Sequence, residues 1–319
     1  MMGFLDHFLD HLQPNAVWAL VIIFVLLVIA TLISYALKLK NSSRDYSELL
    51  SRIHSWWVMA TLFAVVFLLS RSTALVFFAF ISFLALKEYL SLIPTRRADH
   101  RVLFWVYAAI PFQYYWASME WFGMFIIFIP VYLFLFMPMR MVIIGEVDGF
   151  LRAAGTLHWG VMITVFSLSH IAYLLVLPVE GNPIGGGAGL VIFLVVLTQL
   201  NDVSQYVWGK LLGRRKVIEK VSPNKTWEGF IGGVLTTTLL ATLAAPWLTP
   251  LNLYESILAG LIIGMGGFIG DVIISAVKRD LKVKDSGNLL PGHGGILDRV
   301  DSLTYTAPLF FHYLYYLHY

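Results

Sequence analysis

Long apolar stretches separated by short polar connections dominate this chain of 319 residues. A helix needs about 20 apolar residues to cross the hydrocarbon core of a bilayer. Windows of that kind recur along the whole chain. The sequence therefore predicts an all-α, polytopic membrane bundle with ten spanning helices, at residues 17–37, 53–69, 72–92, 102–119, 121–136, 159–177, 187–208, 229–247, 256–277 and 303–317.

The composition supports a membrane protein. Hydrophobic residues make up 59% of the chain and charged residues 13%. Soluble domains contain roughly 45–50% apolar residues and about 25% charged residues. The net charge is only +3 and no basic tail is present, so nothing indicates a nucleic-acid partner. The chain has no cysteine, which excludes disulfides, zinc–thiolate sites and thiol nucleophiles. Any metal must therefore take oxygen or imidazole ligands.

Lysines and arginines fall in every second connection, and such residues in short loops favour the cytoplasmic side. The basic connections lie near residues 38–52, 96–101, 140–152, 210–225 and 278–299. The connections near residues 120, 180–187 and 250–255 contain none, and only Arg71 breaks the alternation. We therefore expect both termini on the non-cytoplasmic side and the two long polar loops in the cytoplasm.

The chain shows no internal repeat and no low-complexity linker, so we expect one transmembrane domain over residues 17–319. Residues 1–16 lack the basic start of a signal peptide. Their apolar positions recur at helical spacing, which is typical of an amphipathic helix lying in the membrane interface. A frayed tail is an equally good interpretation of this segment.

Asp271 lies inside the ninth apolar window, where a carboxylate costs about 2.5–3.5 kcal/mol on insertion scales. Asp271, Ser275 and Lys278 are spaced by four and three residues, so they share one face of that helix. A buried carboxylate needs a cation or a water-filled cavity. The alternative is a contact between Asp271 and Lys278 that only joins helices.

A polar segment follows at residues 278–301. Its glycines permit tight turns, and a loop of this kind presents N–H groups and lysines to phosphate oxygens. Asp298 and Asp301 are one helical turn apart at the start of the tenth window, with Arg299 between them to bind a phosphate or to neutralise an acid. Two carboxylates suit a nucleotide-bound magnesium ion. The alternative is an ordinary solvated charge cluster.

Another acid, Asp202, lies inside the seventh window, where it ends a long apolar run. In the loop that follows, Ser222, Asn224 and Thr226 precede the eighth window, where they can donate to a phosphate or cap the helix. The basic run at residues 214–220 is equally well explained as a topology signal, as contact with anionic lipid, or as a substrate site.

These two segments resemble the CDP-diacylglycerol synthase (phosphatidate cytidylyltransferase) family. Every fixed position of that signature is filled, from Ser275 to Asp301. The earlier block, with Ser222-Pro223, Lys225-Thr226 and Glu228-Gly229, is similar to the same family. It departs from the family at Gln205, where alanine is expected, and at Lys210, where arginine is expected. The resemblance covers residues 198–305.

The resemblance implies transfer of a cytidylyl group from CTP to phosphatidate, giving CDP-diacylglycerol and pyrophosphate. It implies catalytic roles for Asp271, Lys278, His293, Asp298 and Asp301. It implies Mg²⁺, with room for a second cation, held by Asp202, Asp271, Asp298 and Asp301. The implied substrate-binding residues are Ser222, Asn224, Lys225, Thr226, Ser275, Arg279, Lys284, Asp285, Gly294, Gly295 and Arg299.

We expect His293 to bind or orient a substrate, because the phosphate of phosphatidate is already ionised and needs no general base. The expected partners are CTP, phosphatidate and membrane lipids, with no nucleic acid, and a homodimer is left open. Compact length and short loops favour a bacterial inner membrane, with the active site facing the cytoplasm.

Other functions compete with this interpretation. Paired intramembrane acids near glycines also mark ion-coupled transporters, but such proteins are commonly built from repeats, which this sequence lacks. A CTP-dependent lipid kinase, or a cytidylyltransferase for a different lipid, accounts for the same polar segments.

Overall fold

The structure is a computed structural model that describes residues 12–40, 46–96, 99–287 and 294–319. The predicted interfacial helix at residues 1–16 falls mostly outside these ranges. The described residues form helices joined by loops. In chain order these are α2 (Pro14–Lys40), α3 (Ser47–Leu69), α4 (Arg71–Leu92), α5 (His100–Ser118), α6 (Phe122–Ile127), η2 (Phe128–Leu133), α7 (Phe134–Ile143), α8 (Phe150–Val161), η3 (Met162–Phe166), α9 (Ser167–Val176), η4 (Val179–Gly181), α10 (Gly186–Leu212), α11 (Trp227–Leu248), α12 (Leu253–Asp280), α13 (Leu297–Val300) and α14 (Leu303–His318).

Among the described residues, eight helical segments are long and apolar enough to cross a membrane, so the chain is an integral membrane protein. They are Pro14–Lys40, Leu49–Leu69, Arg71–Leu92, Phe122–Ile143, Phe150–Val176, Gly186–Leu212, Trp227–Leu248 and Leu253–Asp280. The other two predicted windows also lie on helices. These are α5, with 19 residues, and α14, with 16. The all-α prediction is confirmed, and eight of its ten spans meet the criteria of length and hydropathy.

The sixth predicted window begins well inside its helix. The window starts at residue 159, but the helical segment runs over Phe150–Val176. Leu151 and Arg152 in its first turns are exposed, so the helix extends beyond the apolar stretch that marked it. A π-helical turn, η3, interrupts it, and the Thr164 hydroxyl donates to the carbonyl oxygen of Gly160 at 2.7 Å. A hydropathy window marks only the apolar part of a helix, so it does not show where a polar extension of that helix begins.

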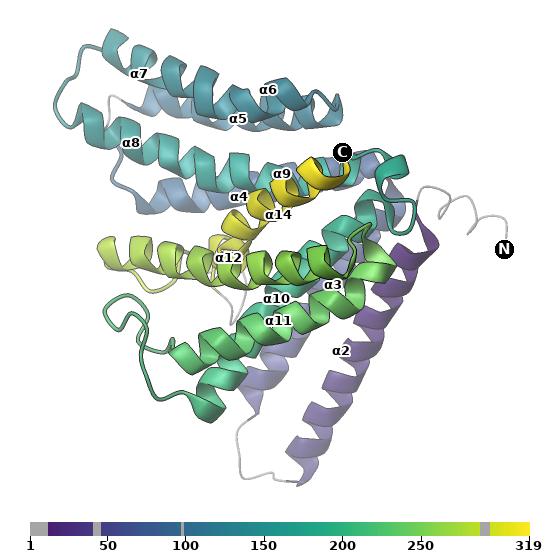
Figure 1. The fold of residues 1–319 in the computed structure, drawn as a ribbon. Coiled ribbons are helices and arrows are strands. Elements are labelled where there is room, and N and C mark those ends of the chain that lie inside the picture. Colours follow the sequence, from purple (N-terminus) through teal and green to yellow (C-terminus); the bar gives the residue numbers. More distant parts are fainter. Residues whose placement is uncertain (1–11, 41–45, 97–98, 288–293) are drawn as a thin grey trace.

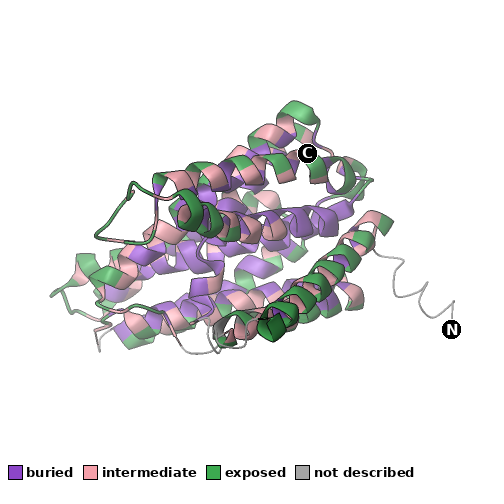
Figure 2. Ribbon diagram, turned by 90° about the horizontal axis from the view of Figure 1, so that it is seen from below, coloured by how far each residue is buried: buried purple, intermediate pink, exposed green. Residues whose placement is uncertain are grey.

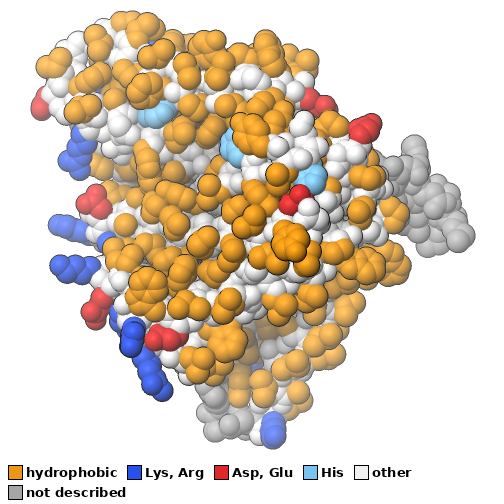
Figure 3. All heavy atoms as spheres, in the orientation of Figure 1, with side chains coloured by type: hydrophobic (Ala, Val, Ile, Leu, Met, Phe, Trp, Pro, Cys, Tyr) orange, Lys and Arg blue, Asp and Glu red, His pale blue; other side chains and the backbone are white. Residues whose placement is uncertain are grey.

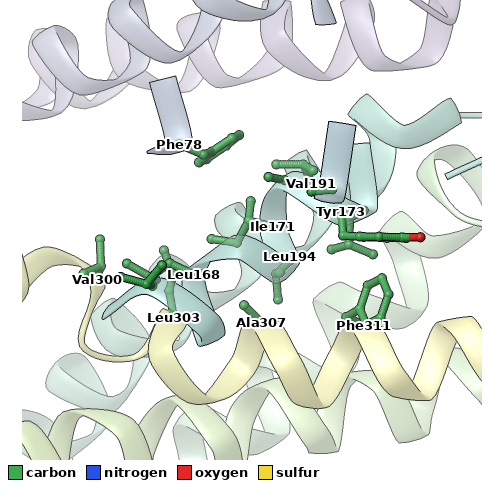
Figure 4. Close-up of a cluster of buried hydrophobic side chains, with 14 of the residues drawn as sticks. Phe78, Leu168, Ile171, Tyr173, Val191, Leu194, Val300, Leu303, Ala307 and Phe311 are labelled. Atoms are coloured by element: carbon green, nitrogen blue, oxygen red, sulfur yellow. The ribbon is translucent and has the colours of Figure 1, made fainter. Parts of the chain in front are cut away.

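The central helices carry the core. In Figure 1, α5, α6 and α7 lie on one side of the bundle, and α2 and α3 lie on the other. All ten residues of α9 between them are buried, and Figure 2 shows that burial concentrates on the interior helices. Around α9, Leu168 and Ile171 lie near Leu194 of α10 and Ala307 of α14 (Figure 4). This packing fixes α10, which carries Asp202, and α14, which begins two residues after Asp301.

Positive charges gather at one end of the bundle. Figure 3 shows lysine and arginine side chains along one edge, where the α7–α8 and α10–α11 connections lie in Figure 1. The exceptional Arg71 is paired instead: its guanidinium lies 2.6 Å from Oε1 of Glu120 and donates to the carbonyl oxygen of Val176 at 2.8 Å. The pairing gives this arginine a structural role. The sidedness of the termini remains a prediction.

Candidate active site

Helix α12 approaches the α13–α14 turn closely, and this contact organises the site. A Cβ atom on Gly270 would lie 2.5 Å from the carbonyl oxygen of Asp301 and 3.1 Å from the Cα of Ser302. Only glycine leaves room for that backbone. Asp271, the next residue of α12, is thereby brought close to Asp301.

Three carboxylates converge here, two from α10 and α12 and one from the turn between α13 and α14. Asp202, Asp271 and Asp301 are near enough to interact electrostatically. The hydroxyl of Ser302 donates to the two carboxylate oxygens of Asp202 at 3.1 and 3.0 Å, and the Ser302 N–H donates to Oδ1 of Asp301 at 2.8 Å. Like charges this close need a cation to offset their repulsion.

Lys225 supplies one such cation. Its Nζ lies 2.5 Å from Oδ2 of Asp271 and donates to Oε1 of Gln205 at 3.1 Å. Its charge also acts on Asp202 and Asp301. The next residue, Thr226, caps α11 by accepting from the Gly229 N–H at 3.1 Å, which is one of the two roles predicted for it. Lys225 thus lies at the fixed start of a helix, among the acids.

Lys278 pairs with Asp298 rather than with Asp271. The Lys278 Nζ lies 2.7 Å from Oδ1 of Asp298. Oδ2 of Asp298 accepts from the N–H and hydroxyl of Ser286, at 2.8 and 3.0 Å, and from the Gly295 N–H at 3.1 Å. Burial by itself raises the pKa of the Asp298 carboxyl, but these hydrogen bonds and the lysine outweigh it, so the pKa lies below the ordinary 3.8. Asp298 is therefore ionised and fastens the loop to α12.

The sequence suggested that Asp298 and Asp301 start one continuous helix, but the structure divides this segment into two helices. Asp298 belongs to the short α13, Asp301 follows it in a turn, and α14 begins at Leu303. Asp298 is engaged by the loop, whereas Asp301 interacts with Asp202 and Asp271. The change of direction between α13 and α14 gives the two acids different surroundings.

The donor set can be compared with what magnesium requires. Within the described ranges, no group of three or more histidine, aspartate or glutamate side chains is arranged to hold a metal alone. Nucleotide-bound magnesium needs only one or two carboxylates, since phosphates and water complete its shell. Asp202, Asp271 and Asp301 fit that requirement as a cluster of hard oxygen ligands. The predicted participation of Asp298, whose oxygens already hold Lys278 and the loop, remains a prediction.

Comparison with known proteins identifies the family. Residues 50–317 match the cytidylyltransferase family. The chain belongs to this family. It is 48% identical over 298 residues to the "Uncharacterized protein YnbB" of Escherichia coli (strain K12), covering 93% of this chain and 98% of that protein. It is also similar to proteins named phosphatidate cytidylyltransferase. Identity is 40% over 124 residues for Staphylococcus epidermidis and 43% over 125 residues for Staphylococcus aureus, each covering 39% of this chain and 48% of the relative.

Other predicted substrate residues of this cytidylyltransferase-family chain surround the cluster in different ways. Ser275 donates to Oδ1 of Asp271 at 3.3 Å, and Arg279 donates to the carbonyl oxygens of Val221 and Val283 at 3.2 and 3.3 Å. Ser222 is half-buried, while Asn224, Lys284 and Asp285 are exposed. The buried Nε of Arg299 has no hydrogen-bond partner among the described residues. His293 lies outside the described ranges.

Sequence analysis missed Glu88, at the end of the third window. Its Oε1 accepts from the Ile296 N–H at 2.8 Å, and its Oε2 accepts from the Leu297 N–H at 2.8 Å and from the Ser286 hydroxyl at 3.1 Å. The available signal was a carboxylate inside an apolar window, the same signal that identified Asp271.

Proposed function

We propose that this chain transfers a cytidylyl group from CTP to phosphatidate, giving CDP-diacylglycerol and pyrophosphate. The observation that carries the proposal is the cluster in which Lys225 lies among Asp202, Asp271 and Asp301. Lysines beside carboxylates can receive a triphosphate and a lipid phosphate together. Membership of the cytidylyltransferase family supports the nucleotide and the type of reaction.

In the proposed reaction, an oxygen of the lipid phosphate attacks the α-phosphorus of CTP. The new P–O bond forms as the bond to the β-phosphate breaks, and pyrophosphate leaves with the bonding electrons. Both reactants are anions, so their repulsion forms much of the barrier. Lys225, Lys278 and Arg299 offset this repulsion electrostatically and hold the two phosphates in line. No covalent enzyme intermediate is needed.

Asp202, Asp271 and Asp301 are the residues that would hold magnesium in this scheme. The bound ion supplies neutralisation of the triphosphate charge. Lys225 offsets the charge of the acids in the substrate-free protein. The pair of Asp298 and Lys278 fastens the loop before α13 to α12.

The location of the cluster suits a lipid acceptor. It lies on membrane helices near the connections where lysines and arginines gather (Figure 3). A lipid phosphate can arrive from the bilayer while CTP arrives from water. We propose that this end faces the cytoplasm of a bacterial inner membrane. The homodimer remains a prediction.

A different lipid phosphate is the second candidate acceptor. Gln205 stands where the family signature has alanine, and its Oε1 accepts a hydrogen bond from the Lys225 Nζ at 3.1 Å. Because this difference from the family signature contacts Lys225 directly, it favours a lipid phosphate other than phosphatidate as the acceptor. The relative that covers nearly the whole chain is uncharacterised, so it does not favour phosphatidate over other lipids.

The test uses purified protein in lipid nanodiscs with magnesium and CTP labelled at the α- or the γ-phosphate. We expect label from the α-position in the lipid product when phosphatidate is supplied, with release of pyrophosphate, and no labelling by Asp271→Asn. Label from the γ-position would indicate a kinase, and labelling only with another lipid would identify another acceptor. Absence of labelling with every lipid would overturn the proposal in favour of transport.

A further inference from the structure

Glu88 joins two parts of the chain that are far apart in sequence. It lies on α4, whereas its partners Ile296 and Leu297 begin α13, the segment that carries Asp298 and Arg299. Each carboxylate oxygen accepts one backbone N–H at 2.8 Å. Two consecutive N–H groups bound to one carboxylate fix both the position and the direction of the main chain.

The glycines of the signature loop are explained by the same contact. A Cβ atom on Gly295 would lie 2.3 Å from Oε2 of Glu88 and 2.4 Å from the Ser286 Oγ. Gly294 has a φ of +77°, and its Cβ would lie 2.5 Å from Oδ2 of Asp298. The two glycines thus pass between two carboxylates, one from α4 and one from α13.

Ser286 links these two carboxylates. Its hydroxyl lies 3.1 Å from Oε2 of Glu88 and 3.0 Å from Oδ2 of Asp298. The hydroxyl has one proton, so it donates to one carboxylate at a time. Through Asp298 the connection continues to Lys278. A change at Glu88 is therefore transmitted to a lysine of the proposed site.

We propose that Glu88 is a positioning residue for the reaction. Its carboxylate holds residues 295–297 in the place from which Arg299 and Asp301 face Asp202 and Asp271. Its effect on turnover rests on the proposed function, while its effect on the loop does not. The N-terminal half of the chain thereby contributes directly to the order of the site.

The first measurement compares Glu88→Gln, Glu88→Asp and the control Glu146→Gln, which changes an exposed acid in the α7–α8 connection. The amide of glutamine offers one acceptor oxygen, so one N–H loses its partner. We expect kcat to fall by about 10- to 100-fold with KM for CTP nearly unchanged, because small misplacements cost rate. Glu88→Asp should restore part of the rate, and Glu146→Gln should behave as wild type.

The second measurement is amide hydrogen exchange, which needs no activity. In Glu88→Gln one of the Ile296 and Leu297 amides should exchange about tenfold faster, as expected for loss of one hydrogen bond worth about 1.4 kcal/mol. Protection in α12 should stay unchanged. Ser286→Ala provides a milder variant if Glu88→Gln does not fold; it should accelerate the same amides to a smaller extent.

Wild-type kcat together with wild-type protection in Glu88→Gln would overturn the inference. A raised KM with unchanged kcat would also overturn it, since Glu88 would then contribute to binding alone. If the wild-type protein labels no lipid, the proposed function fails, but the exchange comparison still decides the role of Glu88.

Discussion

The Nζ of Lys225 lies 2.5 Å from Oδ2 of Asp271, joining the loop before α11 to the middle of the site on α12. The lysine side chain is 18% exposed and the aspartate side chain 23% exposed. A cation held this firmly beside Asp202 and Asp301 keeps the acids together before any substrate arrives.

Removing one partner of this pair should cost stability, and removing both should restore it. Lys225→Met leaves three acids without their nearest cation, and Asp271→Asn leaves a lysine without its closest acceptor. We expect each to lower the free energy of unfolding by about 1–3 kcal/mol, less than for a fully buried pair. The double variant should recover most of the loss when thermal unfolding is followed in detergent. All three should lose at least about 100-fold in turnover. A double variant as unstable as the single ones, or any active one, would contradict the prediction.

The contribution of Asp298 should depend on pH in a defined direction. The folded pKa of this carboxyl lies below its ordinary value, so the stabilisation is complete above the unfolded pKa of about 3.9 and is lost as the pH falls through the folded pKa. Thermal unfolding of wild type and Asp298→Asn should therefore differ by a constant amount from about pH 8 to pH 5 and converge below about pH 4. Convergence already between pH 8 and pH 6 would show that the folded pKa is raised instead.

Gly295→Ala should disable the loop. Its added methyl group meets Oε2 of Glu88 and the Ser286 Oγ at 2.3 and 2.4 Å, so the segment before Asp298 has to shift. We expect turnover to fall by about 100-fold, with faster amide exchange at residues 295–298. Gly155→Ala is the matched control, since a Cβ there has no neighbour within 4 Å. Equal activity of the two variants would show that the loop tolerates the displacement.

Gln205→Ala should be tolerated. Lys225 keeps its contact with Asp271, and the buried Nε2 of Gln205, which has no partner among the described residues, is removed. Loss of the unsatisfied Nε2 favours the folded state, whereas loss of the Oε1 that accepts from Lys225 opposes it, so the melting temperature should change little. The ratio of labelling rates for phosphatidate and other lipid phosphates is the informative measurement. If this ratio is the same in Gln205→Ala and in wild type, Gln205 does not determine which lipid is the acceptor.

The apolar windows predicted the helices well because burial in lipid demands continuous hydrophobicity. They missed the start of α8, where exposed Leu151 and Arg152 extend the helix beyond its apolar part. The cost of burying charge drew out Asp202 and Asp271, whereas Lys225 and Asp301 came from the family signature and from the spacing of the two acids. The contacts between distant segments were not predictable. Lys278 meets Asp298, and Glu88 meets Ile296, only after helices far apart in the sequence have packed.

The main-chain contact at Gly270 has a consequence for how this site can diversify. No side chain separates α12 from the backbone of Asp301 and Ser302, so the gap between two of the acids is set by the polypeptide backbone itself. A substitution at Gln205 would change the contacts of Lys225 while that gap stays the same. Under the proposed function, a spacing of the acids that is set by the backbone would allow the acceptor to change while the arrangement of Asp271 and Asp301 is kept.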